Sequence, residues 1–547
     1  MKKRRRKPLQ KHRNKPLQRI ASRALHASVM LSQIEQTGPS TDKFVKGSKI
    51  AAGSGFFVAP YLIATNIHCV VGTTWVFVEP VSLPNTYPIE SVVAFDDKMD
   101  LVILRVSVEG MPIPLADSDT VEMGEQIYAV RCVGGGIEEK GARGAVTEGT
   151  VHGIRQTDAH LRLKTSLSSG NSGGPVINKA GEVMGIAVAG GNPVGGRTEE
   201  RIVEFAYAIP SNAIKSLLEE ARTEEAFETW RERPRIRAYA EASQGYLKQN
   251  TGEYKAAIKH YTDALQHNPD LAAIYHNRGT LKNVLGHHKE AIADWDAALK
   301  CNPDLAEAYF NRGAAKNALG DFEGGIVDCS TAIDLHPDAT PAYYNRALAR
   351  MELKRYTEAI ADYDKALELL LSKADAYGAY YNRALGKYLL GLEKAAQGDE
   401  AEAVELYHAA IPDYTQAIKV APNRNLASKN YNNRGYAKYL IAEHESADGN
   451  MEEARILYEE AMIDSEEALK RDRRNAYAYC TRAVVLIAFD AYDAAIDDFD
   501  SAIKLDPGFA HAYHQRGLAK QAIGQQQEAE ADLRKAKQLD PDVGKIS

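Results

Sequence analysis

Several features that would assign this chain to a familiar class are scarce or missing from its 547 residues. No apolar run reaches the ~18 residues of a membrane-spanning helix, so the sequence predicts no transmembrane segment. The cysteines are few and lack the CxxC spacing of a zinc site, which also argues against a disulfide framework. We therefore expect free thiols at all five cysteines, which are Cys69, Cys132, Cys301, Cys329 and Cys480.

Motifs for cofactors and metals are absent as well. The chain has no GxxxxGK[ST] phosphate loop, no dinucleotide-binding GxGxxG fingerprint and no cluster with metal-ligand spacing. The sequence therefore predicts neither a cofactor nor a metal site.

Acidic residues are missing from the first 34 positions, which hold eleven Lys and Arg, although the whole chain has a net charge of −7. We interpret residues 1–45 as a basic, disordered extension. Contact of this tail with nucleic acid or an anionic membrane is the less favoured alternative. The stretch from Ile20 to Ile34 is interrupted by Arg23 and His26 and is a poor secretory signal. We therefore expect a cytoplasmic protein.

The rest of the chain has two regions that differ in their residue pattern. Residues 46–215 alternate short apolar or β-branched runs with Gly, Pro and Asp turns, which predicts an all-β barrel or sandwich. From Pro210 onward Ala, Glu, Lys, Tyr and Leu recur at helical spacing. We interpret residues 216–237 as a helical linker between the two halves.

A 34-residue repeat occupies the second half. The segments "YHNRG", "YFNRG" and "YYNRA" begin at Tyr275, Tyr309 and Tyr343, each 34 residues after the previous one. This period resembles the tetratricopeptide repeat (TPR), a pair of helices. We count about eight units over residues 238–543, with helices of the fifth and sixth units lengthened by Ala- and Glu-rich insertions. The resemblance implies an all-α superhelical solenoid whose concave face binds a protein partner.

The β half contains a candidate nucleophile in "SSGNSGGPVIN", which runs from Ser168 to Asn178. Its glycines permit a sharp turn that would present Ser172 and leave main-chain N–H groups accessible. His68 follows one strand-like run and Asp100 precedes another. Taken singly, these residues suit a packed histidine and a turn aspartate. Together they suit nucleophilic catalysis, in which His takes the Ser proton and Asp orients the imidazole.

The motifs "TNIH", "DLVILRV", "GNSGGPVIN" and "YAIPSN" occur in the order found in the trypsin-like serine peptidases. The β half resembles this family, and within it the HtrA/DegP-like branch. The resemblance implies a double barrel with His68, Asp100 and Ser172 as the catalytic triad. It also implies that the backbone N–H groups of Gly170 and Ser172 form the oxyanion hole.

The same resemblance implies a substrate pocket. An acid at the base of this pocket would select basic side chains, but Ser166 occupies that place here. We therefore expect cleavage after small or medium apolar residues, not after Lys or Arg. The implied pocket residues are Ser166, Ile186, Ala187, Val188 and Ala206.

An "N-R-G/A" signature marks five repeats. In peptide-binding TPR proteins this Asn faces the groove, so the resemblance implies amides that bond the backbone of an extended peptide. The alternative is structural, with the neighbouring arginines paired to acids between repeats. The repetition suits both interpretations. The asparagines are Asn277, Asn311, Asn345, Asn382 and Asn433.

The sequence thus predicts a multidomain chain, an all-β trypsin-like peptidase followed by an all-α TPR solenoid. Its expected function is that of a serine endopeptidase that hydrolyses protein or peptide substrates, with the array recruiting substrate or a regulator. The alternative is an interaction scaffold whose peptidase domain is latent or vestigial.

Overall fold

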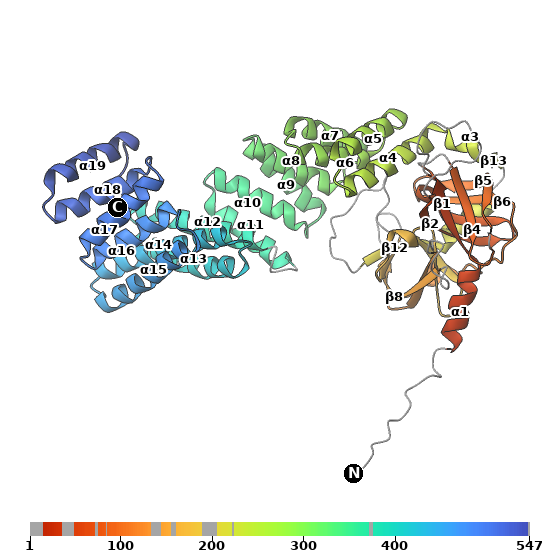
Figure 1. The fold of residues 1–547 in the computed structure, drawn as a ribbon, viewed down its shortest axis with the longest axis horizontal. Helices are drawn as coiled ribbons and strands as arrows, with labels where there is room; N and C mark the ends of the chain where they lie inside the picture. The colour runs from red at the N-terminus through yellow and green to blue at the C-terminus, as the bar shows by residue number, and fades with distance from the viewer. Residues whose placement is uncertain are drawn as a thin grey trace, which may run out of the picture. The chain divides into compact units, whose positions relative to one another are not determined.

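The structure is a computed structural model that describes residues 15–34, 49–71, 75–83, 85–132, 144–154, 160–188, 205–220, 224–370 and 376–544. The chain divides into two compact units, residues 1–303 and 304–547. The first holds the β-strands and helices α1 to α7, and the second holds helices α8 to α19 (Figure 1). No helix in the described ranges is long and apolar enough to cross a membrane.

The first barrel has six strands in the order β5-β4-β1-β2-β3-β6, and pairing of β5 with β6 closes it. Because side chains alternate along a strand, Val102 and Leu104 of β6 pack inside the barrel. Leu101 and Ile103 instead pack on its outer face, against the second barrel. The strands are β1 (Ser28–Ile34), β2 (Lys49–Ala59), β3 (Leu62–Asn66), β4 (Trp75–Pro80), β5 (Tyr87–Asp96) and β6 (Leu101–Val106).

The second barrel closes in the order β10-β11-β12-β9-β8-β7. Ala187 of β11 lies inside it, whereas Ile186 and Val188 pack in the cluster shared with the first barrel. This double barrel confirms the predicted fold of the β half. The strands are β7 (Gln126–Cys132), β8 (Gly144–Ile154), β9 (Leu161–Lys164), β10 (Pro175–Ile177), β11 (Val183–Val188) and β12 (Phe205–Pro210).

The N-terminal region differs from the disordered extension predicted for residues 1–45. Helix α1 (Lys15–His26) leads into β1, and β1 pairs with both β2 and β4. Val29 and Leu31 are fully buried in the barrel core. This segment is therefore part of the first barrel, because its alternating apolar residues complete the sheet. Residues 1–14 and 35–45 lie outside the described residues.

The segment interpreted as a helical linker packs against the first barrel. It contains the end of α2 (Ser211–Glu220), the short strand β13 (Glu225–Ala226) and helix α3 (Phe227–Arg231). Strand β13 pairs with β5, and Trp230 is fully buried in the core of the first barrel. The connection to the repeats is thus built into the β half.

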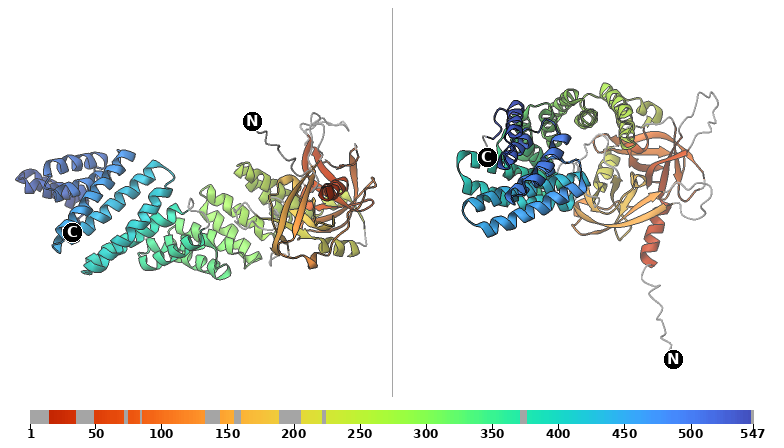
Figure 2. Two further views of the ribbon diagram at one scale, coloured as in Figure 1. Left: turned by 90° about the horizontal axis from the view of Figure 1, so that it is seen from below. Right: turned by 60° about the vertical axis from the view of Figure 1, so that its left-hand side comes forward.

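Eight helix pairs come next, and those of the second unit stack in chain order (Figure 2). Helices α12 to α15 have 21 to 24 residues, against 13 or 14 in the pairs from α6 to α11, which confirms the lengthening predicted for the fifth and sixth repeats. The pairs are α4 (Pro234–Asn250) and α5 (Tyr254–His267), α6 (Ala272–Val284) and α7 (His288–Cys301), α8 (Ala306–Ala318) and α9 (Phe322–Leu335), α10 (Thr340–Glu352) and α11 (Tyr356–Leu369), α12 (Tyr377–Gln397) and α13 (Glu400–Val420), α14 (Arg424–Ala447) and α15 (Met451–Arg471), α16 (Ala476–Ala488) and α17 (Tyr492–Leu505), and α18 (Ala510–Ala522) and α19 (Gln526–Leu539).

Arginines of the repeat signature join the two helices in seven of the eight described pairs, all except α4 and α5. Each makes a two-pronged bond to an aspartate of its own repeat and lies over the ring of a tyrosine three positions earlier. The structural interpretation expected acids of neighbouring repeats. The structure places the main partner within the repeat, whereas Arg383 also pairs with Asp364 of the preceding repeat, as expected. The pairs are Arg278–Asp294, Arg312–Asp328, Arg346–Asp362, Arg383–Asp413, Arg434–Asp464, Arg482–Asp498 and Arg516–Asp532.

Candidate active site and repeat groove

Two neighbouring strands of the first barrel bring His68 and Asp100 together. Strands β3 and β6 are antiparallel, and the last residue of β3, Asn66, pairs with the first of β6, Leu101. The short helical turn η1 (Ile67–Cys69), which follows β3, therefore lies beside Asp100, which precedes β6. Residues 32 positions apart in the sequence meet because the strand ends coincide.

A dense set of hydrogen bonds fixes this pair. His68 Nδ1 and Asp100 Oδ2 are 2.5 Å apart, and the His68 backbone N–H donates to Asp100 Oδ1 at 3.1 Å. The Asp100 carbonyl accepts bonds from the Ile67 N–H at 3.2 Å and from Asn66 Nδ2 at 3.0 Å. Asp100 is only 1% exposed. A buried carboxylate needs such donors, and here they also fix the direction of the imidazole.

The charge of Asp100 controls the titration of His68. Burial by itself lowers the pKa of an imidazole, because it disfavours the cation. The negative charge of Asp100 and the hydrogen bond to it outweigh this effect, with a contribution from Cys69, and the pKa of His68 lies well above its ordinary value of 6.5. The site therefore stabilises a protonated His68.

Ser172 follows a tight helical turn between β9 and β10 of the second barrel. This turn, η3 (Ser169–Asn171), is stabilised at its start by mutual bonds between Ser168 and Asn171. The next residue, Gly173, has φ +78°, and a Cβ there would lie 2.1 Å from the Ser54 carbonyl oxygen. Only glycine fits this place. The predicted role of the glycines in shaping the turn thus has a physical basis at Gly173.

The backbone of Ser172 contacts the first barrel next to His68. Its carbonyl accepts a bond from the Ser54 N–H at 2.8 Å, and Cys69 Sγ lies 3.5 Å from the same oxygen. Ser54 Oγ in turn donates to the Gly170 carbonyl at 2.8 Å. The backbone of Ser172 thus lies where the two barrels meet, beside Cys69, which follows His68 in η1. Gly170 and Ser172, whose N–H groups are the expected oxyanion donors, flank Asn171 in η3.

The residues expected to form the substrate pocket are spread over one loop and two strands. Ser166 is exposed in the loop after β9, and Ala206 of β12 pairs with Leu163. The other three residues lie on β11. Ala187 is buried inside the second barrel, and Ile186 and Val188 are buried in the core between the two barrels, so these side chains pack in the interior. The chain after Val188, residues 189–204, lies outside the described residues. The pocket itself stays a prediction.

Tyr239 lies close to the triad and was not expected from the sequence. This residue of α4 is 2% exposed and belongs to the core of the first barrel together with Cys69. Burial, the charge of Asp100 and a hydrogen bond to the Asp100 side chain raise the pKa of Tyr239 well above its ordinary value. The sequence offers one sign that the first repeat helix has a separate role. The first unit has Ser243 and Gln244 where the five signature repeats have Asn and Arg.

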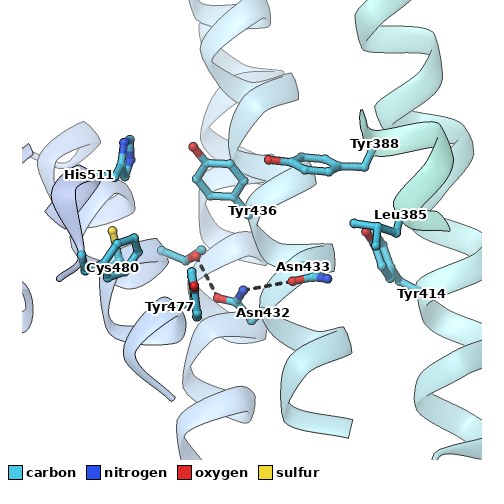
Figure 3. Close-up of a pocket in the computed structure, with 11 residues that line it drawn as sticks. Leu385, Tyr388, Tyr414, Asn432, Asn433, Tyr436, Tyr477, Cys480 and His511 are labelled. Atoms are coloured by element: carbon cyan, nitrogen blue, oxygen red, sulfur yellow. Dashed lines mark hydrogen bonds between the residues drawn. The ribbon is translucent and has the colours of Figure 1, made fainter. Parts of the chain in front are cut away.

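A cavity of about 240 Å³ lies in the second unit, between the first helices of the last four repeats (Figure 3). Asn433 and Asn432 are bonded to each other at 3.2 Å at its floor, and Thr481 Oγ1 donates to Asn432 at 2.9 Å. Aromatic side chains form most of the remaining wall. The lining residues are Leu385, Tyr388, Tyr414, Asn432, Asn433, Tyr436, Tyr477, Cys480, Thr481, Phe509 and His511.

The other signature asparagines differ in their surroundings. Asn382 donates to the Tyr344 hydroxyl at 3.1 Å, which ties it to the preceding repeat. The carbonyl of Asn345 accepts a bond from Asn317 at 2.9 Å. Asn277 and Asn311 are half-buried at the same position of α6 and α8. Of the five, Asn433 is the one that lines the cavity.

The five cysteines are all free thiols, which confirms that expectation. Four are buried, and Cys301 is exposed. In the ranges that the structure describes, no group of three or more His, Cys, Asp or Glu side chains could hold a metal ion.

Models of protein families match both halves of the chain. A model of the trypsin-like peptidase domain matches residues 53–186. Models of the tetratricopeptide repeat match residues 285–320, 340–370 and 510–543. These matches agree with the double barrel and with the helix pairs.

Known relatives resemble one part of the chain. A probable periplasmic serine endoprotease DegP-like of Rickettsia prowazekii is 31% identical over 183 residues, which cover 31% of this chain and 33% of the relative. Serine protease HTRA1 of Xenopus tropicalis is 30% identical over 187 residues, or 32% of this chain and 37% of the relative. The chain thus spans about a third of the length of these relatives.

A solved structure, the HtrA-type protease AlgW with a decapeptide, is 21% identical with a TM-score of 0.30, covering 37% of this chain and 67% of that chain. One segment of the chain thus matches the trypsin-like peptidase domain and resembles HtrA-like and DegP-like serine proteases, and other segments match tetratricopeptide repeats.

Proposed function

We propose that the protein is a serine endopeptidase that uses Ser172 as nucleophile, His68 as general base and Asp100 as the residue that orients His68. The observation that carries the proposal is the buried Asp100 carboxylate, which receives both the backbone and the ring N–H of His68. The Ser172 carbonyl contacts Ser54 and Cys69. A purely structural salt bridge between His68 and Asp100 would not need a serine turn beside it. The presence of Ser172 next to this pair therefore favours acyl transfer.

The side chains supply each step of that chemistry. With Nδ1–H of His68 donated to Asp100, the neutral ring keeps its lone pair on Nε2. Nε2 takes the Ser172 proton as Oγ attacks the peptide carbonyl carbon, and it returns this proton to the leaving amine. Water then cleaves the acyl-enzyme with His68 again as base. The N–H groups of Gly170 and Ser172 would hold the oxyanion, each such donor contributing about 2.7–4 kcal/mol to barrier lowering.

The repeats would recruit a protein substrate or a regulator. The support is the cavity lined by Asn433, Thr481 and several aromatic rings. Amides can bond the backbone of a bound peptide, while aromatic rings bury its apolar side chains. Because Ser166 is uncharged, we propose cleavage after small or medium apolar residues.

A second candidate function is that of an interaction scaffold with a latent peptidase. The burial of Ser172, which is 1% exposed, favours it. A nucleophile must contact its substrate, so a conformational change that exposes Ser172 would have to precede catalysis. A peptidase that opens only when a partner binds the repeats combines both candidates.

Labelling with a fluorophosphonate probe distinguishes these cases. The full chain and its Ser172→Ala variant are treated with the probe, with and without host lysate. Labelling of the wild type alone establishes an activated Ser172. Labelling that needs lysate indicates a gated peptidase, and absence of labelling in both conditions contradicts the peptidase proposal and favours the scaffold.

A further inference from the structure

Helix α4 belongs to two hydrophobic cores at once. Ile236 and Tyr239, one turn apart, pack into the core of the first barrel. Ala242 packs against α5 in the core of the first repeat, and a Cβ on Gly245 would lie 2.6 Å from the Tyr261 ring. Successive side chains of a helix are about 100° apart, so Ile236 and Gly245, nine residues apart, lie on opposite sides of α4. The contacts of α4 thus pass from the first barrel to the first repeat along and around the helix.

Helix α4 packs on the elements that carry His68 and Asp100. Helix α4 contacts η1, which holds His68. Arg235, at the start of α4, lies 3.4 Å from Asp97 in the turn that leads to Asp100. Just before α4, the Trp230 ring packs edge-on against Phe95 in the strand before that turn, with centroids 5.7 Å apart. The junction therefore holds the turn that presents Asp100.

Tyr239 reaches the catalytic carboxylate itself. Tyr239 is buried in the same core cluster as Cys69 of η1, and a hydrogen bond to the Asp100 side chain is among the causes that raise the pKa of Tyr239. A phenol can only donate its proton to an ionised carboxylate. Asp100 thus has three donors: the backbone N–H and Nδ1 of His68, and the Tyr239 hydroxyl. The two donors of His68 belong to η1 of the first barrel, and the Tyr239 hydroxyl belongs to α4, the first repeat helix.

We propose that Tyr239 is a positioning residue for the triad, through which the first repeat helix holds the Asp100 carboxylate in the direction that orients His68. This inference rests on the proposed peptidase function. Tyr239 touches neither the nucleophile nor the substrate in this scheme. It acts through Asp100, and so the repeat array takes part in building the active site in addition to recruiting partners.

Loss of this hydroxyl has a signature that differs from simple destabilisation. Without Tyr239 as donor, more of the Asp100 charge acts on His68, which favours the imidazolium and shifts the pKa of His68 further upward. The carboxylate also becomes less fixed, which slows proton transfer. The other titratable or charged groups around the pair are Cys69 of η1, Asp97 of the β5–β6 turn and Arg235 of α4.

The test compares full-length wild type, Tyr239→Phe and the control Tyr246→Phe, which removes the same hydroxyl two helical turns further along α4. The measurement is the second-order rate of fluorophosphonate labelling from pH 5 to 10. For Tyr239→Phe we expect a maximal rate lower by roughly three- to tenfold and an acid limb moved upward by roughly half a pH unit. The control should match wild type.

An unchanged acid limb in a folded Tyr239→Phe protein would overturn the inference, even if the rate fell. A wild type that is not labelled, with lysate or without, refutes the proposed function separately. In that case the low-field proton resonance of the His68–Asp100 hydrogen bond decides the inference, since it needs no turnover. A titration midpoint equal in wild type and Tyr239→Phe would overturn it, and an upward shift would support it.

Discussion

Asp100 combines two features that rarely occur together in a residue outside a functional site. Its φ of +60° places a non-glycine residue in the left-handed region, which costs about 1–3 kcal/mol. Its carboxylate is also buried. Both costs are offset because the carbonyl and the carboxylate bind the whole η1 turn. The strained backbone thus aims the side chain at His68 while the carbonyl anchors the strand end.

The raised pKa of His68 predicts the pH dependence of the site. Catalysis needs the neutral imidazole, so fluorophosphonate labelling of Ser172 should rise with pH through a midpoint well above 6.5. In Asp100→Asn the charge that stabilises the imidazolium is gone, and labelling should fall by about 10⁴-fold. A midpoint at or below pH 6.5 in the wild type would contradict the inference that the charge of Asp100 outweighs burial in setting the pKa of His68.

The same shift has a consequence for stability. The folded state binds the His68 proton more tightly than the unfolded chain does, so this contribution is fully present below the unfolded pKa of about 6.5. It is lost as the pH rises through the raised folded value. Activity and the stability contributed by His68 therefore change in opposite directions with pH.

At the level of elements, the repeats depend on buried ion pairs as well as on small-residue packing. Asp362 receives Arg346 and also Arg350, at 2.7 and 2.5 Å, and its side chain is 5% exposed. Arg346 reaches further to Ser330 of the preceding repeat at 3.0 Å. Arg346 therefore ties its helix pair internally and links it to the preceding pair.

Removal of one such aspartate should be costly. Asp362→Ala leaves two guanidinium groups half-buried without their carboxylate, and we expect the free energy of unfolding to fall by about 3 kcal/mol. The control is Glu459→Ala, whose partner Arg455 and own side chain are 65% and 53% exposed, with an expected loss below about 1 kcal/mol. Urea unfolding of the full chain measures both. Equal losses would show that the buried pairs add nothing to the array.

Local sequence patterns were sufficient to predict most helices and strands, and the predictions that failed did so for physical reasons. The repeat period predicted the helix pairs because each unit is a local structure. The Val29 and Leu31 alternation was visible, but the basic tail before it led to a prediction of disorder, and only pairing with β2 and β4 makes it a strand. Motif order brought His68, Asp100 and Ser172 into one hypothesis. The contact of Tyr239 with Asp100 joins residues 139 positions apart, and no local pattern predicts such a contact.

At the scale of the whole molecule, the first unit holds both the candidate active site and the first two repeats, while the second unit holds the aromatic cavity. This division predicts separable effects. Changes at α4 should alter the chemistry of Ser172, whereas changes at the cavity should alter which proteins are recruited. The two kinds of variant can be distinguished because probe labelling needs no recruitment.

Tyr477 offers the sharpest test of recruitment. It lines the cavity, packs against Phe509 in a tilted arrangement with centroids 4.8 Å apart and is 59% exposed, so its truncation should leave the helix intact. Exposed aromatic anchors often contribute about 2 kcal/mol or more to binding. Tyr477→Ala should therefore weaken partner capture and cleavage of captured protein by at least about tenfold, with the rate of fluorophosphonate labelling unchanged.

The matched control for this prediction is Ile463→Ala, which truncates an equally exposed side chain, 59%, on helix α15 outside the cavity lining. Capture is measured with both changes in the Ser172→Ala background, so that bound protein is not cleaved, and cleavage is measured in the active chain. If Tyr477→Ala and Ile463→Ala capture equally well, recruitment uses another surface of the array. If Tyr477→Ala loses capture alone, the cavity is where the array selects the protein that the peptidase half then meets.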